Sequence, residues 1–185
     1  MSYSSSADIA NFLLKARNDH VQWNVGSTPP LENLDDVYAV QDLITSKLGA
    51  DIRAWKTSPL DNGSAFAGPI YATDIFESGA RIPASKFHVI GIEGEIAFRI
   101  NRDLPAQDQP YRRDDIQASI AEMFPLIELV DTRMVDGMEQ DATLKMADNQ
   151  SNYGIVIGAA SSKNWNDVNA TKAEVHLTVN GQSLF

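Results

Sequence analysis

The spacing of apolar residues predicts two helices near the amino terminus. Apolar side chains recur every three or four positions from Ser6 to Arg17 and again from Asn33 to Leu48, as they do along one face of an α-helix. Gly49 stands where the second helix would end, and glycine is the usual residue just beyond a helix carboxy terminus. Residues 1–50 are therefore expected to form an amino-terminal helical cover rather than a separate domain.

Beyond residue 50 the apolar positions alternate with polar ones or form short runs, which is typical of β-strands. Runs of this kind occupy residues 52–57, 90–100, 126–130, 153–159 and 174–179. Residues 51–185 are therefore expected to form a β-rich core. The whole chain has the length of one structural domain.

Three connecting segments carry further expectations. Residues 59–69 are rich in glycine, proline and other small residues, so we expect a flexible loop that closes over a ligand. A helix is expected from Asp114, which would cap it, to Pro125, which would end it. Asn180-Gly181 predicts a hairpin turn, after which only four residues remain for the returning strand. We therefore expect either further residues in the native protein or an oligomer that covers the open sheet edge.

Two glutamates interrupt the apolar run at residues 90–100. With a period of two, Glu93 and Glu95 lie on one face of the strand and the isoleucines on the other. Their backbones are about 6–7 Å apart, so the two anions would repel each other unless a cation lay between them. Glu128, in the middle of the run 126–130, is a third carboxylate, and it requires a partner if it is buried. The alternatives are a solvated strand face for the first pair and an edge strand that turns Glu128 to water.

Two other ionisable residues lie near these strands. Lys56 shares a strand face with Ile52 and Ala54, which places it either in a site or with its stem over apolar surface and its ammonium in water. His88 precedes the glutamate strand, where a lone histidine is more often a hydrogen-bonded structural residue. No histidine has metal-ligand spacing, and the sequence contains no G-x-S-x-G, phosphate-loop or dinucleotide-binding motif.

The composition narrows the classes of ligand. The chain has 185 residues, 43% of them hydrophobic and 22% charged, with a formal net charge of -10. Such a charge disfavours binding to nucleic acid or to an anionic membrane, so the expected partner is a small molecule. No cysteine is present, which excludes disulfides and thiolate chemistry. Because the sequence has neither a signal-peptide pattern nor a long apolar run, we expect a cytoplasmic location.

Three motifs together resemble a known family. They are Gly91-Ile92-Glu93-Gly94-Glu95-Ile96-Ala97-Phe98, the run from Pro125 to Arg133, and Ala147-Asp148-Asn149. In combination they are similar to the 2-keto-4-pentenoate hydratase and 4-oxalocrotonate decarboxylase branch of the fumarylacetoacetate hydrolase superfamily. The likeness runs from about Val37 to Gly181. It is specific because an E-x-E motif is followed by a glutamate in the context I-E-L-V-D-T-R.

The resemblance implies an α+β fold, a mixed β roll or sandwich with the amino-terminal helices packed outside, and assembly into a homo-oligomer. It also implies that Glu93, Glu95 and Glu128 ligate a divalent metal, Mg²⁺ or Mn²⁺, and that Lys56 is the catalytic lysine. Carboxylate oxygens suit these hard ions. The implied ligand is a small 2-oxo or 2-enol carboxylic acid.

The implied activity is that of a hydratase, a lyase that adds water to a 2-hydroxy-2,4-dienoate or 2-oxo-4-enoate in the catabolism of aromatic compounds. Decarboxylation of a 2-oxo diacid and hydrolysis of an acylpyruvate are alternatives on the same metal site. Hydrolysis ranks lower, because it usually requires a water-activating histidine and only His88 lies between Lys56 and Glu93. A non-catalytic subunit that binds a partner enzyme is a further alternative.

Overall fold

The structure, a computed structural model, describes residues 5–61, 63, 65–169, 172 and 174–184. The chain divides into two compact units. The first contains Met1–Glu93 and Glu128–Val156, and the second contains Gly94–Ile127 and Ile157–Phe185. The expectation of a single structural domain stays a prediction.

Two capped helices begin the first unit, as the sequence predicts. Helix α1 spans Ser6–Asp19 and starts with a capping box. Helix α2 spans Leu34–Leu48, and the side chain of Asn33 caps its first turn. Gly49 ends α2 with a φ of 58°, a left-handed conformation that glycine adopts without steric cost.

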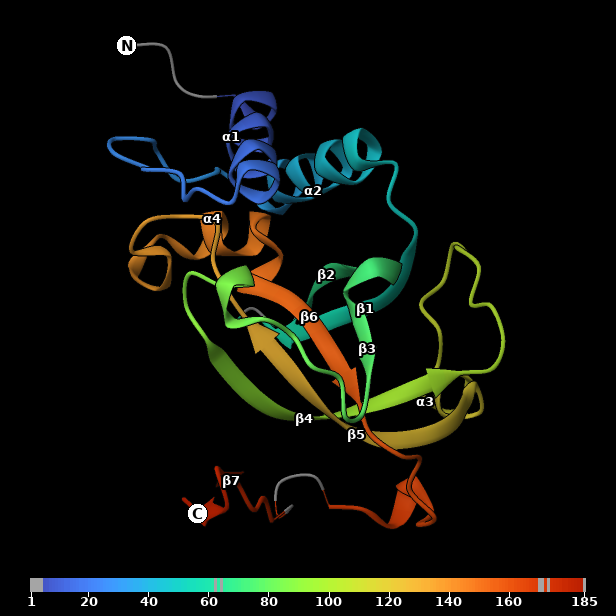
Figure 1. The fold of residues 1–185 in the computed structure, drawn as a ribbon. Coiled ribbons are helices and arrows are strands. Elements are labelled where there is room, and N and C mark those ends of the chain that lie inside the picture. The colour runs from blue at the N-terminus through green and yellow to red at the C-terminus, as the bar shows by residue number, and fades with distance from the viewer. Residues whose placement is uncertain (1–4, 62, 64, 170–171, 173, 185) are drawn as a thin grey trace. The chain divides into compact units, whose positions relative to one another are not determined.

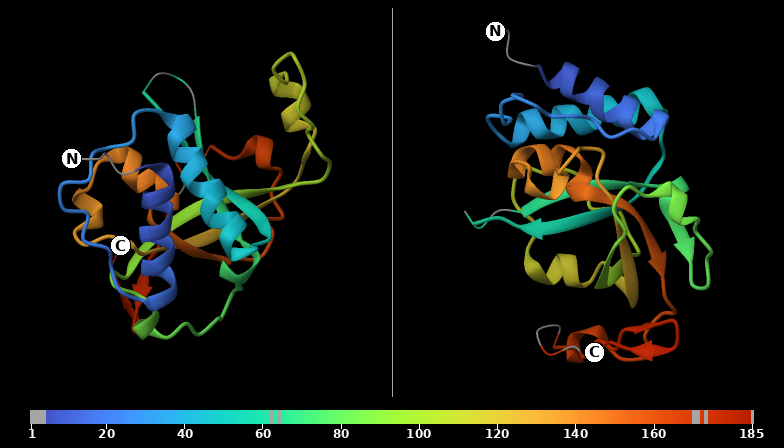
Figure 2. Two further views of the ribbon diagram at one scale, coloured as in Figure 1. Left: turned by 90° about the horizontal axis from the view of Figure 1, so that it is seen from above. Right: turned by 60° about the vertical axis from the view of Figure 1, so that its left-hand side comes forward.

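The apolar core of the first unit lies between its helices. Helix α1 packs against α2, and α2 packs against the short helix α4, which spans Ala142–Ala147 (Figures 1 and 2). Phe66 and Met134 are fully buried in the same cluster. The helices contribute Ile9, Ala10, Leu13, Val37, Val40, Ile44, Leu144, Met146 and Ala147. Helices α1 and α2 thus bury apolar side chains at the predicted spacing. No helix in the described part of the chain combines the length and apolarity that a bilayer span needs.

Strands β1 and β2 form an antiparallel pair in the first unit. Strand β1 spans Ile52–Pro59 and β2 spans Ala65–Tyr71, with Lys56 directly opposite Gly68. The expectation of a closing loop over residues 59–69 is wrong for residues 65–69, which belong to strand β2, and for Pro59, which ends β1. Of the residues between the two strands, 62 and 64 lie outside the described residues. Burial of the apolar side chains of β2 outweighs the turn preference of its glycine and proline, since strand preference depends strongly on packing.

A second sheet has four strands in the order β3–β6–β5–β4. They span Ile75–Glu77 (β3), Gly91–Ile100 (β4), Ile120–Val130 (β5) and Asn152–Ile157 (β6). Short 3-10 turns lie at Ala72–Asp74, Ala84–Lys86, Gly137–Glu139, Asn149–Ser151 and Trp165–Asp167. The strands predicted at residues 90–100, 126–130 and 153–159 are thereby confirmed. The ends of β4 and β6 differ little from the prediction, whereas β5 begins at Ile120, well before residue 126.

The expectation of a helix from Asp114 to Pro125 is wrong. Helix α3 covers only Arg113–Gln117, and the chain then enters β5, with Pro125 inside the strand. Along the second half of β5 every other side chain is buried, so a period of two prevails over the helical spacing that its first apolar residues also fit. The side chains that alternate in this way are Phe124, Leu126, Glu128 and Val130.

The second unit contains the hairpin that Asn180-Gly181 predicts. Strand β7 spans Thr178–Val179 and β8 spans Gln182–Ser183. Both turn residues have a positive φ, as a tight two-residue hairpin turn requires. The paired part is two residues long on each side, shorter than the strand expected over residues 174–179.

Candidate metal centre

Strand β1 holds Lys56 on its more buried side. Alternate residues of the strand, beginning at Ile52, are half-buried, and the residues between them are exposed. Lys56 belongs to the half-buried set, and its side chain is 11% exposed. Gly68, the residue opposite, adds no side chain beside it. The ammonium is therefore held among other groups and not in bulk water.

Glu128 is a buried carboxylate with two partners. Its side chain is 1% exposed, and burial of a charge without partners costs on the order of several kcal/mol. The Lys56 ammonium donates to Glu128 Oε2, and the side-chain amide of Asn152 donates to Oε1 at 2.8 Å. The alternative of an edge strand that turns Glu128 to water is therefore wrong.

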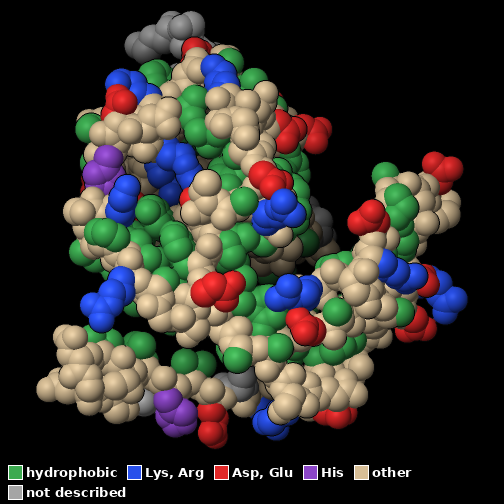
Figure 3. Space-filling model, turned by 45° about the vertical axis from the view of Figure 1, so that its right-hand side comes forward, with side chains coloured by type: hydrophobic (Ala, Val, Ile, Leu, Met, Phe, Trp, Pro, Cys, Tyr) green, Lys and Arg blue, Asp and Glu red, His purple; other side chains and the backbone are tan. Residues whose placement is uncertain are grey.

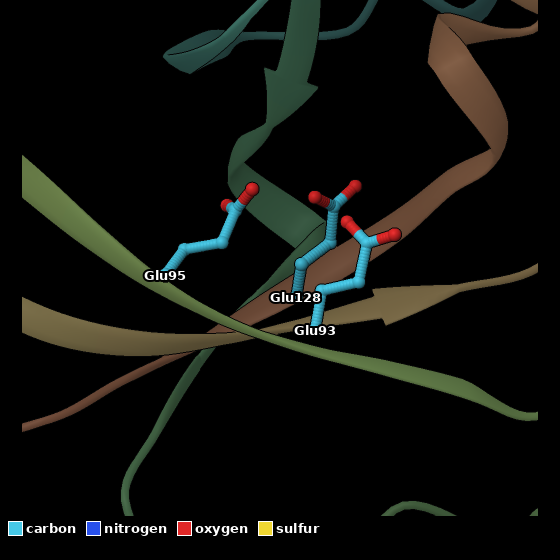
Figure 4. Close-up of side chains that lie close together, drawn as sticks. All are labelled: Glu93, Glu95 and Glu128. Carbon is cyan, nitrogen blue, oxygen red and sulfur yellow. The ribbon is translucent and has the colours of Figure 1, made fainter. Parts of the chain in front are cut away.

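Glu93 and Glu95 bring their carboxylates close to that of Glu128. One carboxylate oxygen from each of the three lies within 4.8 Å of the other two (Figure 4). Glu93 Oε2 is also 3.4 Å from Lys56 Nζ. Alternation along β4 puts Glu93 and Glu95 on one strand face, as their spacing predicts. The geometric condition for a shared cation is met.

The donor set fits a hard divalent cation. Three carboxylates and one ammonium leave a formal charge of −2 in the cluster, which a divalent ion would neutralise. All the candidate ligand atoms are carboxylate oxygens, which Mg²⁺, Mn²⁺ and Ca²⁺ prefer. Because Glu128 is fully buried, repulsion between the carboxylates is poorly screened by solvent there. The metal-ligand role of the three glutamates stays a prediction that this geometry supports.

A buried ion pair fixes the backbone of Asn152. Arg133 Nε donates to a carboxylate oxygen of Asp148, and Arg133 Nη1 donates to the backbone carbonyl of Asn152 at 2.8 Å. Burial raises the pKa of the Asp148 carboxyl, and the nearby Arg133 guanidinium opposes that rise. The pair thus anchors the residue whose side-chain amide holds Glu128.

The turn that precedes β6 has an unusual backbone. Asn149, Gln150 and Ser151 have φ values of 52°, 53° and 59°, in a region that costs a non-glycine residue roughly 1–3 kcal/mol. Ser58 on β1 donates a hydrogen bond to Gln150 Oε1 at 2.9 Å. Because Ser58 shares its strand face with Lys56, this strained turn borders the candidate metal centre.

Two contacts were not predicted from the sequence, the hydrogen bond from Asn152 to Glu128 and the stacking of His88 on His20. Asn152 carries no charge and no motif spacing; only the position of β6 beside β5 brings its amide to Glu128. The motif Ala147-Asp148-Asn149 was the available signal, because it lies just before Asn152. His88 lies against the ring of His20, with the ring centroids 4.3 Å apart.

Comparison with known proteins supports the fold. No family model matches the sequence. The structure is similar to 4-oxalocrotonate decarboxylase from Pseudomonas putida G7 complexed with magnesium and adipate, with a TM-score of 0.71 and 21% identity over 83% of this chain and 62% of that one. The same decarboxylase complexed with calcium and acetate gives a TM-score of 0.68 and 20% identity over 83% of this chain and 61% of the other.

These likenesses confirm the predicted α+β fold. They concern the fold alone, because the identity is low. The chain spans about three fifths of the length of the decarboxylase chains it matches, 62% and 61%. The activity of the whole protein is therefore a matter for proposal.

Proposed function

We propose that this chain carries the metal centre of a lyase that acts on a small 2-oxo or 2-enol carboxylic acid. The observation that carries the proposal is the contact of the Lys56 ammonium with Glu128 and Glu93 in a cluster of three carboxylates. A proton-carrying group beside a cation site is what enolate chemistry requires. The similar decarboxylase structures, complexed with magnesium and adipate or with calcium and acetate, support the choice of ligands.

Glu93, Glu95 and Glu128 would hold the cation, Mg²⁺ or Mn²⁺. A divalent ion bound there supplies Lewis acidity, which stabilises negative charge on a substrate oxygen. Asn152 orients Glu128 through its hydrogen bond to Oε1. Groups that orient a ligating side chain in this way tune both affinity and activity at metal sites.

Lys56 is the group that would hold and move a proton, at Nζ. An ammonium has three N–H donors, and Lys56 directs this group toward Glu128 and Glu93. Its side chain is 11% exposed, so exchange of that proton with bulk water is restricted. From this position Nζ would deliver a proton to a substrate carbon or orient a water molecule.

Two reactions are candidates for this site. Hydration, which the family resemblance implies, adds the oxygen of water to one carbon of a conjugated double bond and a proton to its neighbour. Decarboxylation breaks a carbon–carbon bond, releases CO₂ and adds a proton to the remaining carbon; the similar structures favour it. Hydrolysis of an acylpyruvate stays below both, because His88 contacts His20 and no histidine belongs to the acidic cluster found among the described residues.

An assay with paired substrates tests the proposal. The protein is incubated with a 2-hydroxy-2,4-dienoate or a 2-oxo-4-enoic diacid, each with Mg²⁺, with Mn²⁺ and with a chelator. Loss of diene absorbance with uptake of labelled water indicates hydration, and labelled CO₂ indicates decarboxylation. Glu93→Gln should abolish either activity. Glu122→Gln, an exposed acid on β5 paired with Arg99, should not.

The controls separate the competing interpretations. Turnover that persists in chelator, or in Glu93→Gln, would contradict a metal-dependent lyase at this cluster. Metal binding without turnover of either substrate would instead favour the non-catalytic subunit.

A further inference from the structure

The first unit contains a polar cavity whose lining includes none of the three clustered glutamates. Its volume is about 490 Å³, within the range of about 300–1,000 Å³ that small-molecule sites occupy. The face drawn in Figure 3 is hollowed in its upper part, with basic side chains in the hollow and a histidine beside it. The cationic, imidazole and phenol side chains of its lining are those of Arg17, His20, Lys86, His88, Arg133 and Tyr153.

This cavity lies on the other face of β6 from Glu128. Asn152 directs its side chain to Glu128, and Tyr153, the next residue of the strand, lines the cavity. Successive side chains of a strand point to opposite faces. A substrate at the candidate metal centre would therefore leave this cavity free.

The Lys86 ammonium favours an anion in this cavity, although the chain as a whole has a net charge of -10. The other two basic side chains of the lining are already paired, Arg17 with Asp74 and Arg133 with the buried Asp148. Two carboxylates, those of Asp74 and Asp131, also line the cavity. Both carboxylates are already engaged. Asp74 forms an ion pair with Arg17, and Asp131 Oδ1 accepts the backbone N–H groups of His88 and Val89 at 3.0 and 2.7 Å.

Three donors in the lining remain available. Within the described part of the chain, the side chains of Lys86, His20 and His88 form no hydrogen bond or ion pair. The two imidazoles stack, with an interplanar angle of 22°. His20 ends helix α1 in a left-handed conformation, with a φ of 52°, which is uncommon for a residue other than glycine. The backbone carbonyls at a helix carboxy terminus favour positive charge on a neighbouring side chain.

We infer that this cavity binds a small oxyanion, a molecule that carries a carboxylate or phosphate group. The Lys86 ammonium would form the ion pair, and the ring N–H groups of His20 and His88 would donate to the same oxygens. The ring of Tyr153 would form part of the wall. The inference is independent of the proposed lyase activity, because it uses none of the glutamate cluster.

Histidine NMR tests the site directly, because the chain has only three histidines. His20 and His88 line the cavity, and His176 belongs to the second unit and serves as an internal control. The full chain with Mg²⁺ is titrated with inorganic phosphate or with succinate at constant pH and ionic strength. We expect saturable shifts of the His20 and His88 ring resonances and none of His176. If the shifts saturate at a lower concentration of phosphate than of succinate, the site prefers phosphate groups; the reverse order indicates a preference for carboxylates.

A lysine variant provides the second criterion. Lys86→Met should weaken binding by about 10–100-fold, as expected for loss of a charge-assisted hydrogen bond. Lys163→Met, an exposed lysine in the second unit, should leave the titration unchanged. Equal, unsaturable shifts of all three histidines, or an unchanged titration in Lys86→Met, would overturn the inference.

Discussion

The Lys56 ammonium lies against the buried carboxylate of Glu128 and 3.4 Å from Glu93 Oε2. One side chain on β1 thus compensates a charge on β5 that burial would otherwise make costly. Removing one partner of a buried ion pair costs about 3–5 kcal/mol. Lys56 therefore has a structural role beside its proposed chemical one, and tests of its chemistry need a measurement of stability.

Replacing Lys56 with methionine should lower turnover by about 10²–10⁴-fold, because the group that moves the proton is lost. Metal affinity should not fall, since a competing cation has been removed from beside the ligands. Steady-state kinetics and calorimetry measure the two effects. Arg53→Met, on the exposed side of the same strand, is the matched control. A folded Lys56→Met variant that retained most of its activity would remove Lys56 from the mechanism.

Replacing Asn152 with alanine should weaken Mg²⁺ binding by about 10–100-fold, the usual effect of losing a group that orients a metal ligand. The amide lost is the one that donates to Glu128 Oε1 at 2.8 Å. Asn166→Ala, in an exposed turn, serves as the control. Magnesium titrations of both variants give the comparison, and equal affinities would exclude an orienting role for Asn152.

Replacing Arg133 with methionine should destabilise the first unit by about 3–5 kcal/mol at neutral pH, because the Asp148 carboxylate would be buried without its cation. Urea unfolding of the variant and the parent measures the loss. Arg99→Met removes one partner of an exposed pair, Arg99–Glu122, and should change stability by only about 0–1 kcal/mol.

The loss of stability in Arg133→Met, relative to the parent, should depend on pH with a sign that the pKa shift of Asp148 determines. Burial raises the pKa of Asp148, and Arg133 opposes that rise; without Arg133 the folded-state pKa rises further. A group with a raised folded-state pKa stabilises the fold below its unfolded pKa and loses that stability as pH rises through the folded value. The deficit of Arg133→Met relative to the parent should therefore shrink in acid and grow as pH rises above 3.8, the ordinary value. A deficit that grew in acid would contradict this assignment.

Helices α1 and α2 were predictable because their signals are local. The apolar spacing, the cap at Asn33 and the stop at Gly49 all lie within one turn of the feature they specify. The first half of β5 was not predictable, since its apolar residues fit both the helical and the strand period. Its true partner strands, β4 and β6, decide between the periods, and such pairing is not visible in a local window of sequence.

In the candidate metal centre, too, some residues were predictable from local sequence and others were not. Glu93, Glu95, Glu128 and Lys56 were predicted because charged residues inside apolar strands are conspicuous and because the motifs resemble a known family. Asn152 and the strained turn before it were missed, because an uncharged amide carries no such signal. Their roles depend on contacts between β1, β5 and β6 that only the fold establishes.

The central claim is that the cluster of Glu93, Glu95 and Glu128 binds a divalent cation, and calorimetric titration with Mg²⁺ measures it most directly. The parent protein and Glu122→Gln should bind one equivalent with the same affinity. Glu93→Gln, which changes an exposed carboxylate and should leave the fold intact, should weaken binding severely, and Glu128→Gln should do the same. Absence of binding to the parent at millimolar Mg²⁺, or unchanged binding in Glu93→Gln, would contradict the account.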